Sequence, residues 1–138
     1  DAGVNPEELI TFKYEDQGVA TLEDGIWVLE ENLKDPAFED KMVRFVRASM
    51  KGWKYAEANP EEAGAIIIEN DETGAQSEAA QVRMMQEVAK LTAGSNGALL
   101  EADFQRTVDT LLAGGSDPVI SKQPESAWTS VITDKALN

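Results

Sequence analysis

Five consecutive residues, Tyr14-Glu15-Asp16-Gln17-Gly18, carry the groups best suited to contact a small ligand. The ring of Tyr14 can stack on a flat molecule while its hydroxyl donates a hydrogen bond. A carboxylate of Glu15 or Asp16 can accept from a ligand amino group, and Gly18 lets the backbone approach closely. The alternative is a polar strand-to-loop junction with a turn glycine. Tyr14, Glu15, Asp16 and Gly18 are therefore the candidate ligand-binding residues.

The catalytic arrangements that depend on His or Cys are excluded for this chain. It contains no His and no Cys, which excludes Ser-His-Asp and Cys-His arrangements, His-zinc sites and thiol chemistry. The run Gly94–Gly97 lacks the spacing and the Lys of a phosphate-binding loop. Asn70, Asp71 and Glu72 resemble a fragment of a calcium loop, but their oxygens are wrongly spaced for an EF-hand. The sequence predicts a binding protein rather than an enzyme, with no cofactor and no metal.

Composition and charge exclude further classes of partner. The chain has 138 residues, which is enough for one domain with its own core, and its formal net charge is −14. Such acidity argues against binding to nucleic acid or to an anionic membrane surface, because both need clustered Lys and Arg. No run approaches the roughly 20 apolar residues of a membrane span, and no signal peptide is expected within these residues.

The candidate ligand-binding residues follow the first of two predicted strands. Leu9–Tyr14 (LITFKY) is rich in β-branched and aromatic residues, which favour strands. Ile26–Leu29 (IWVL) is a short apolar run that predicts a second, buried strand. Ligands of α/β proteins usually bind at strand ends, which supports a binding role for the residues that follow Leu9–Tyr14.

Helices are predicted for most of the remaining chain. Asp35 is a natural N-cap and Pro36 suits the first helical position. Asn59 and Pro60 repeat this pattern, so they end one helix and begin another. Thr73 with Gln76 has capping-box spacing, and Ser77 is a rival cap for the third helix. A helical turn is also predicted at residues 5–8. The five predicted helices span about residues 36–58, 60–69, 76–93, 99–112 and 124–132.

The first predicted helix carries a broad apolar stripe at helical spacing, which we expect to face the core. The stripe consists of Phe38, Met42, Phe45, Val46, Ser49, Trp53 and Ala56. Trp27 has apolar neighbours and Trp128 lies on a helical stripe, so these two tryptophans are also expected in the core. On the fourth helix, Phe104 and Val108 are expected to point inward with Leu111 and Leu112.

Three stretches resemble a known family. They are FKYEDQGV (residues 12–19), GWKYAEANPEEA (residues 52–63) and SDPVISKQPESAW (residues 116–128). Together they resemble the C-terminal part of periplasmic solute-binding proteins of ABC importers, in the subfamily that handles nitrate, sulfonates, taurine and the pyrimidine precursor of thiamine. The resemblance implies an α/β fold for residues 1–138. They would form part of one lobe of a type II periplasmic-binding-protein fold, helix-rich with two or so short strands, without the rest of that lobe or the second lobe.

The resemblance also implies a function. The chain would be part of the substrate-binding component of an ABC transporter, located in the periplasm or outside the cytoplasm. It would bind a small solute in a cleft between two lobes and pass it to a membrane permease. A carboxylate of Glu15 or Asp16 suits an aminopyrimidine better than a nitrate or a sulfonate. A fungal branch of the family makes the thiamine pyrimidine by consuming an active-site histidine, but that histidine precedes the part resembled here.

Two further expectations concern protein partners. The alternative function is an acidic helical protein–protein interaction domain, whose apolar surface would belong to a partner. If the chain is part of a lobe, Ile26–Leu29 lacks strands to pair with and the stripe of the first helix lacks part of its cover. We therefore expect a homo-oligomer that buries Ile26–Leu29 and part of the Phe38–Trp53 face.

Overall fold

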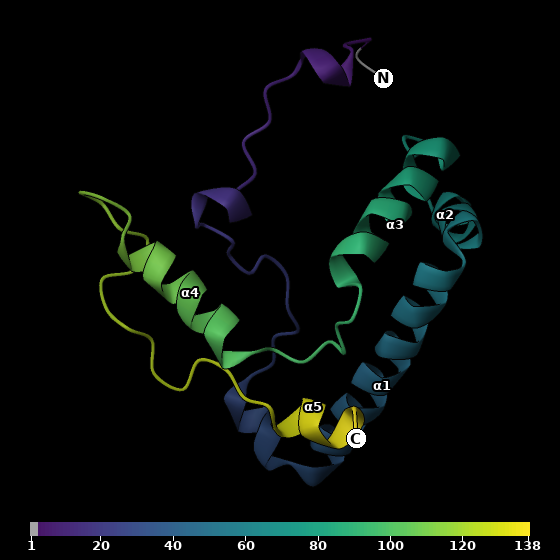
Figure 1. Ribbon diagram of the computed structural model, residues 1–138. Helices are drawn as coiled ribbons and strands as arrows, with labels where there is room; N and C mark the ends of the chain where they lie inside the picture. The colour runs from purple at the N-terminus through teal and green to yellow at the C-terminus, as the bar shows by residue number, and fades with distance from the viewer. Residues whose placement is uncertain (1–2) are drawn as a thin grey trace. The chain divides into compact units, whose positions relative to one another are not determined.

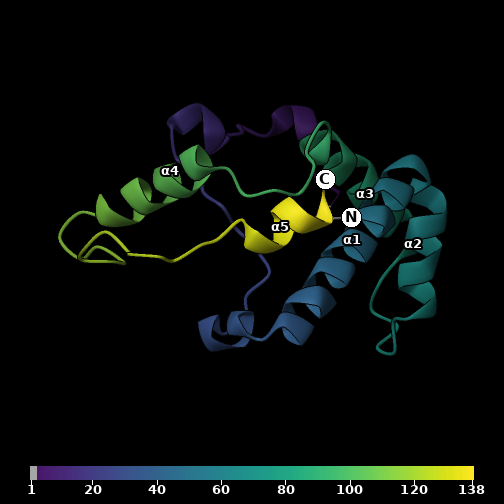
Figure 2. The same ribbon diagram turned by 90° about the horizontal axis from the view of Figure 1, so that it is seen from below.

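The computed structural model of the protein describes residues 3–138, which divide into two compact units. Within the described chain, the first unit comprises residues 3–27 and Leu99–Trp128, and the second comprises Val28–Ala98 and Thr129–Asn138. Figures 1 and 2 show the helices of each unit. Among the described residues, no helix combines the length and the apolar character that a membrane crossing requires.

The second unit is built on α1 (Pro36–Ala58), which begins where the sequence predicts. An Asp35 carboxylate oxygen accepts from the backbone N–H of Ala37 at 2.9 Å, and Pro36 occupies the first helical position. This arrangement satisfies one of the N–H groups that a helix start leaves without an intrahelical partner. A 3-10 helix, Glu30–Lys34, leads into α1 and contacts it. The predicted first helix is therefore confirmed, together with its cap.

A corner at Asn59 joins α1 to α2 (Pro60–Glu69). The predicted corner is confirmed, but Asn59 does not cap α2 through its side chain. Its side-chain amide instead donates to the carbonyl oxygen of Tyr55 at 2.9 Å, and its backbone N–H also points back to the last turn of α1. Asn59 therefore satisfies carbonyl groups at the end of α1, while the fixed φ of Pro60 starts α2.

The α2–α3 pair forms a helical hairpin. The third helix, α3, spans Glu78–Thr92, and the Ser77 hydroxyl accepts from the backbone N–H of Ala80 at 3.2 Å. Ser77 is thus the cap, and the capping-box prediction for Thr73 is wrong because Asp71 engages that residue. Gly64 of α2 is buried against Val82 of α3, where the absence of a side chain lets the two helices approach closely.

The short helix α5 (Val131–Ala136) packs on α1 and completes the core of the second unit. Val43 and Val46 of α1 are buried with Ala136, and the partly buried residues Met50, Ile132 and Leu137 pack against them. The spacing of Val43, Val46 and Met50 places them on one face of α1. Figures 1 and 2 show α5 lying against the first half of α1.

The predicted helix at residues 124–132 is wrong. Pro124–Ser130 is not helical, and Ser126 has a φ of 51°, in the left-handed region that interrupts a right-handed helix. Helical structure begins only at Val131, where Ile132 and Ala136 can pack on α1. Tertiary packing therefore determines where this helix begins. Local sequence preference had predicted a start at Pro124, seven residues before Val131.

Among its described residues, the first unit has one α-helix, α4 (Glu101–Leu112), and two 3-10 helices, Pro6–Glu8 and Glu15–Gln17. The helical turn predicted at residues 5–8 is thus confirmed. Val108 is the most buried core residue, at 3% exposure, and Phe104, Leu111 and Leu112 are partly buried, as the apolar pattern predicts. The Phe104 and Trp128 rings lie 6.1 Å apart at a tilted angle of 44°. This aromatic pair fastens the 113–128 connector to α4.

The two predicted strands do not form. No strand occurs among residues 3–138, and both Leu9–Tyr14 and Ile26–Leu29 are exposed, with Ile10 at 85% and Trp27 at 83%. An extended segment becomes a strand only when a neighbouring segment pairs with its backbone groups, and neither segment has such a neighbour in the described chain. The helix-rich character expected from the sequence is confirmed, but the two short strands are not present among the described residues. Trp27 is not a core residue.

The broad stripe predicted for α1 is only partly buried. Val46 belongs to the core, but Phe45 is 52% exposed and Trp53 is 46% exposed. Because α5 covers the face that carries Val43, Val46 and Met50, the aromatic residues of α1 lie beside or opposite that face. The sequence correctly predicts the position of this amphipathic helix. It does not predict which side of the apolar stripe α5 covers.

Two helical glycines provide a test of this packing. Gly64→Ala should destabilise the second unit by about 1–3 kcal/mol, because the new Cβ would lie 2.6 Å from Val82 Cγ2 and 3.1 Å from its backbone nitrogen. Gly52→Ala, in α1, is the matched control: nothing lies within 4 Å of its new Cβ. It should stabilise by about 0.5–1 kcal/mol. Equal effects of both variants in urea unfolding would contradict close α2–α3 packing.

A second test uses the loop between α2 and α3. Hydrogen bonds from the Thr73 hydroxyl and from the backbone N–H of Gln76 lower the pKa of Asp71. Because its pKa is lower in the folded state, Asp71 contributes stability above the ordinary carboxyl pKa of about 3.9. That contribution disappears as the pH falls through the folded pKa. We expect Asp71→Asn to lower the melting temperature at about pH 7 but much less at about pH 2.

The control for this test is Asp117→Asn, in an exposed loop. It removes one negative charge, as Asp71→Asn does, but it does not remove a carboxylate that accepts hydrogen bonds within the α2–α3 loop. A melting-temperature difference between wild type and Asp71→Asn that stays constant with pH would show that ionised Asp71 does not hold the loop.

Candidate functional site

The residues Tyr14–Gly18 form a single tight turn. Glu15–Gln17 is a 3-10 helix, and the carbonyl oxygen of Tyr14 accepts from the backbone N–H groups of Gln17 and Val19, both at 3.0 Å. Gly18 follows with a φ of 77°, a conformation that glycine adopts at little cost. The turn holds the Tyr14, Glu15 and Asp16 side chains exposed to solvent. Gly18 is therefore a turn glycine, although no strand precedes the turn within the described chain.

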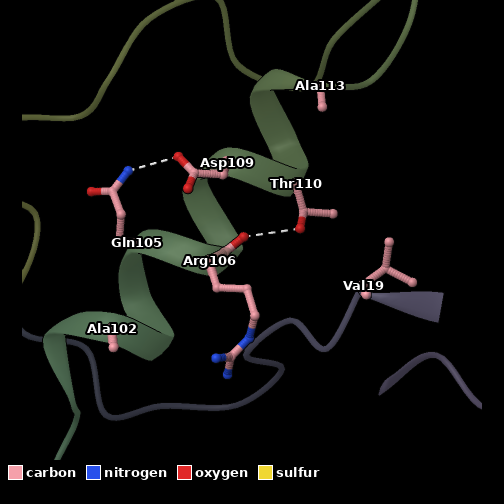
Figure 3. Close-up of a pocket in the computed structure, with 8 residues that line it drawn as sticks. Val19, Ala102, Gln105, Arg106, Asp109, Thr110 and Ala113 are labelled. Carbon is pink, nitrogen blue, oxygen red and sulfur yellow. Dashed lines mark hydrogen bonds between the residues drawn. The ribbon is translucent and has the colours of Figure 1, made fainter. Parts of the chain in front are cut away.

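A hollow of about 630 Å³, open to solvent, lies between this turn and α4. Gly18 and Val19 line it from the turn, and α4 with its following residue contributes the other wall (Figure 3). The α4 wall has polar residues at helical spacing, so that they share one face. The residues on that wall are Ala102, Gln105, Arg106, Asp109, Thr110 and Ala113.

Two hydrogen bonds hold the segment after the turn against α4. Arg106 Nε donates to the carbonyl oxygen of Ala20 at 2.8 Å, and the backbone N–H of Leu22 donates to Thr107 Oγ1 at 2.9 Å. The Arg106 guanidinium also pairs with Asp103 at 2.5 Å, which fixes the direction of the side chain. These contacts join residues more than 80 positions apart and so create the hollow.

The remaining polar groups of the wall form a network along α4. Gln105 Nε2 donates to an Asp109 carboxylate oxygen at 2.8 Å, and Gln105 and Gln123 exchange hydrogen bonds through their side-chain amides. Thr110 Oγ1 donates to the carbonyl oxygen of Arg106 at 2.9 Å (Figure 3). Arg106 supplies N–H donors and Asp109 supplies carboxylate acceptors, so the wall can hydrogen-bond a solute that carries both kinds of group.

The hollow contains one of the four residues predicted from the sequence. Gly18 lines it, whereas Tyr14, Glu15 and Asp16 lie on the same turn but are not among its lining residues. The sequence analysis missed the contribution of α4. Its signal is the polar face of an amphipathic helix, with Gln105 and Asp109 one turn apart. That signal identifies a site only once the segment that packs beside it is known.

A second hollow lies on the α2–α3 hairpin, within the second unit. Its apolar residues are Ile66, Ile67 and Met84, and its polar residues are Asn70, Asp71, Gln76 and Gln81. Gln81 is buried and donates to Gln76 Oε1 at 2.5 Å. Within the described chain, no three acidic side chains gather closely enough to hold a metal ion. Both hollows offer hydrogen-bonding and apolar contacts.

Comparison with known proteins gives one positive finding. Residues 2–63 match the model of a family described as NMT1/THI5 like. The match covers less than half of the chain and includes the Tyr14–Gly18 turn and all of α1, but not α4. No curated protein and no solved structure matches the chain significantly. The family match supports the resemblance to solute-binding proteins for residues 2–63.

The attachment of the turn segment to α4 can be measured by hydrogen exchange. Arg106→Gln removes the guanidinium that binds the Ala20 carbonyl oxygen. We expect the backbone amide of Leu22 to exchange about fivefold faster, the factor that corresponds to roughly 1 kcal/mol for a hydrogen bond from a charged group at an exposed position. Arg83→Gln, which removes an exposed ion pair on α3, is the matched control and should leave that rate unchanged. Unchanged exchange in Arg106→Gln would show that this bond does not position the segment.

Proposed function

We propose that this chain is part of the substrate-binding component of an ABC importer and that it contributes one wall of the solute site. The observation that carries the proposal is the position of Gly18. It lies in the segment that matches the NMT1/THI5-like family, and it lines a hollow opposite the polar face of α4. A small solute would lie in this hollow, between the Gly18–Val19 backbone and the side chains of Arg106 and Asp109.

The polar groups of the wall favour one type of solute within the subfamily. Arg106 offers donors for an anionic group or a ring nitrogen, and Asp109 offers an acceptor for an amino group. Taurine and the aminopyrimidine precursor of thiamine carry both kinds of partner, whereas nitrate carries acceptors alone. We therefore rank an amino-bearing solute ahead of nitrate. Asp16, on the exposed turn, would reach the amino group from the other side when the site closes.

The wider assignment rests on the family match. A solute-binding component of this kind delivers its ligand to a membrane permease and acts in the periplasm or outside the cytoplasm, and we propose both for this chain. The proposal includes no chemical step, because neither hollow presents a nucleophile with an adjacent base.

A second candidate function has its own supporting observation. Large apolar side chains remain exposed on the second unit, among them Phe45, Trp53 and Ile66. Exposed apolar groups beside charged residues are typical of surfaces that bind other proteins. An acidic helical interaction domain would use this surface and would not need the hollow beside α4.

The two functions are separated by titration calorimetry with taurine, nitrate and the aminopyrimidine precursor of thiamine. We expect at least one amino-bearing solute to bind with a dissociation constant of about 1 mM or lower. Asp109→Asn should weaken that binding at least about tenfold, because hydrogen bonds to charged groups contribute roughly 1.5–3 kcal/mol. Asp16→Asn should also weaken it if the turn contacts the solute.

The matched control is Asp40→Asn on α1, which removes an exposed carboxylate paired with Arg44. It should leave the affinity unchanged. Binding of none of the three solutes, or equal affinities for wild type and Asp109→Asn, would overturn the proposed site.

A further inference from the structure

The charges of the second unit are separated into two blocks along its helices. Residues 41–54 contain five of the twelve Lys and Arg residues of the chain and no acidic residue. Residues 55–82 contain seven acidic residues and no Lys or Arg. The first block lies in α1, and the second covers the end of α1, all of α2 and the start of α3. One unit of an acidic protein therefore carries a local positive surface beside a strongly negative one.

The positive surface lies on α1 opposite its buried face. Of the five cations in the first block, only Lys41 and Lys51 belong to this side of α1, since Arg47 contacts α5. The side consists of the exposed row Phe45, Ala48 and Gly52, with Lys41 one turn before Phe45 and Lys51 three residues after Ala48. We call these five residues the basic face. Phe45 is 52% exposed, and among the described residues neither Lys41 nor Lys51 forms an ion pair. The small residues after Phe45 leave room for a second helix to approach closely.

The negative surface has a matching pattern on α2. Glu62, Ile66 and Glu69 follow one another at i, i+4 and i+7, so they form one exposed row. We call them the acidic row. Ile66 is 47% exposed and borders the hollow that also contains Ile67 and Met84. The row therefore presents an apolar side chain between two carboxylates, whereas the basic face presents an apolar side chain near two ammonium groups.

We propose that the basic face of one chain docks on the acidic row of a second copy of the same chain. Phe45 would lie against Ile66 at the edge of the α2–α3 hollow, while Lys41 and Lys51 would pair with Glu62 and Glu69. Each chain carries both surfaces, so a twofold pair would make the contact twice. The Tyr55 hydroxyl donates to Glu62 at 2.5 Å and ties the two helices together at their corner. That bond also raises the pKa of Tyr55.

Charge complementarity selects this occupant over other anionic partners. A membrane surface or nucleic acid presents anions alone, so it would attract the basic face but repel the acidic row of the same unit. In a pair of identical chains, the acidic row of each chain can face the basic face of the other, so both charged surfaces find a partner of opposite charge. The sequence predicted a homo-oligomer whose interface includes Ile26–Leu29 and part of the Phe38–Trp53 face. The proposed interface includes Phe45 from that face but does not include Ile26–Leu29. It does not depend on the proposed solute site, which lies in the first unit.

A charge swap tests the contact by analytical ultracentrifugation of the 138-residue chain. Lys41→Glu/Lys51→Glu and Glu62→Lys/Glu69→Lys should each weaken self-association at least about tenfold, because like charges then face each other. An equimolar mixture of the two variants should recover association, since the swapped surfaces are complementary. Glu69→Lys alone keeps the Tyr55–Glu62 bond intact, and it serves as the second acidic-row variant if the double variant unfolds.

Matched controls separate the contact from net charge. Lys13→Glu/Lys122→Glu and Glu7→Lys/Glu125→Lys make the same changes in net charge at exposed positions of the first unit. They should alter self-association much less than the swaps do. A monomeric wild type at high concentration, swap variants that associate like wild type, or a mixture of folded variants that remains monomeric would each overturn the proposal.

Discussion

The contact between α1 and α5 organises the second unit, because it joins the two ends of that unit's chain. Arg47 of α1 donates to the carbonyl oxygens of Lys135 and Ala136, at 3.1 and 3.3 Å. These carbonyls lie in the last turn of α5, where a helix has no intrahelical donors left and where its dipole favours a cation. Lys135 adds an ion pair to Glu39 on the same side of α1. The apolar cluster of Val43, Val46 and Ala136 lies beneath these polar contacts.

In the first unit, α4 is the helix that holds the other segments together. It holds one segment by apolar contacts and another by hydrogen bonds. Its apolar side carries Val108 and Phe104, and Phe104 holds Trp128 of the following connector. Its polar side carries Arg106 and Thr107, which hold the backbone of the segment after the Tyr14–Gly18 turn. One amphipathic helix thus organises two long segments, and the candidate solute site follows from its polar side.

Local signals in the sequence predicted most helix boundaries because their causes are local. The Asp35-Pro36 start, the Asn59-Pro60 corner and the Ser77 cap each depend on residues within one turn. Most of the predictions that were wrong needed a distant partner, although the local capping-box prediction for Thr73 was also wrong because Asp71 binds that residue. Leu9–Tyr14 and Ile26–Leu29 have strand composition, but strand formation depends on a neighbouring segment.

The same reasoning explains the remaining differences. The apolar stripe of α1 is wide enough to be covered from several directions, and only the position of α5 selects Val43 and Val46 over Phe45. Within the candidate site, Gly18 could be named from the sequence because a glycine in a polar break lets the backbone approach a ligand closely, which is a local property. The α4 wall was missed because Arg106 and Asp109 become site residues only through contact with a segment more than 80 residues away.

The apolar residues of the described chain are shielded incompletely, and this has a thermodynamic consequence. No described side chain is fully buried, and the core residues are divided between two units. The heat capacity change of unfolding and the denaturant m-value both scale with the apolar surface that unfolding newly exposes. Much of that surface is already in contact with water in the folded protein. The heat capacity increment of unfolding should therefore be smaller than the value of about 12–15 cal/mol/K per residue that is typical of well-packed domains. The protein's stability should therefore vary with temperature along an unusually flat curve.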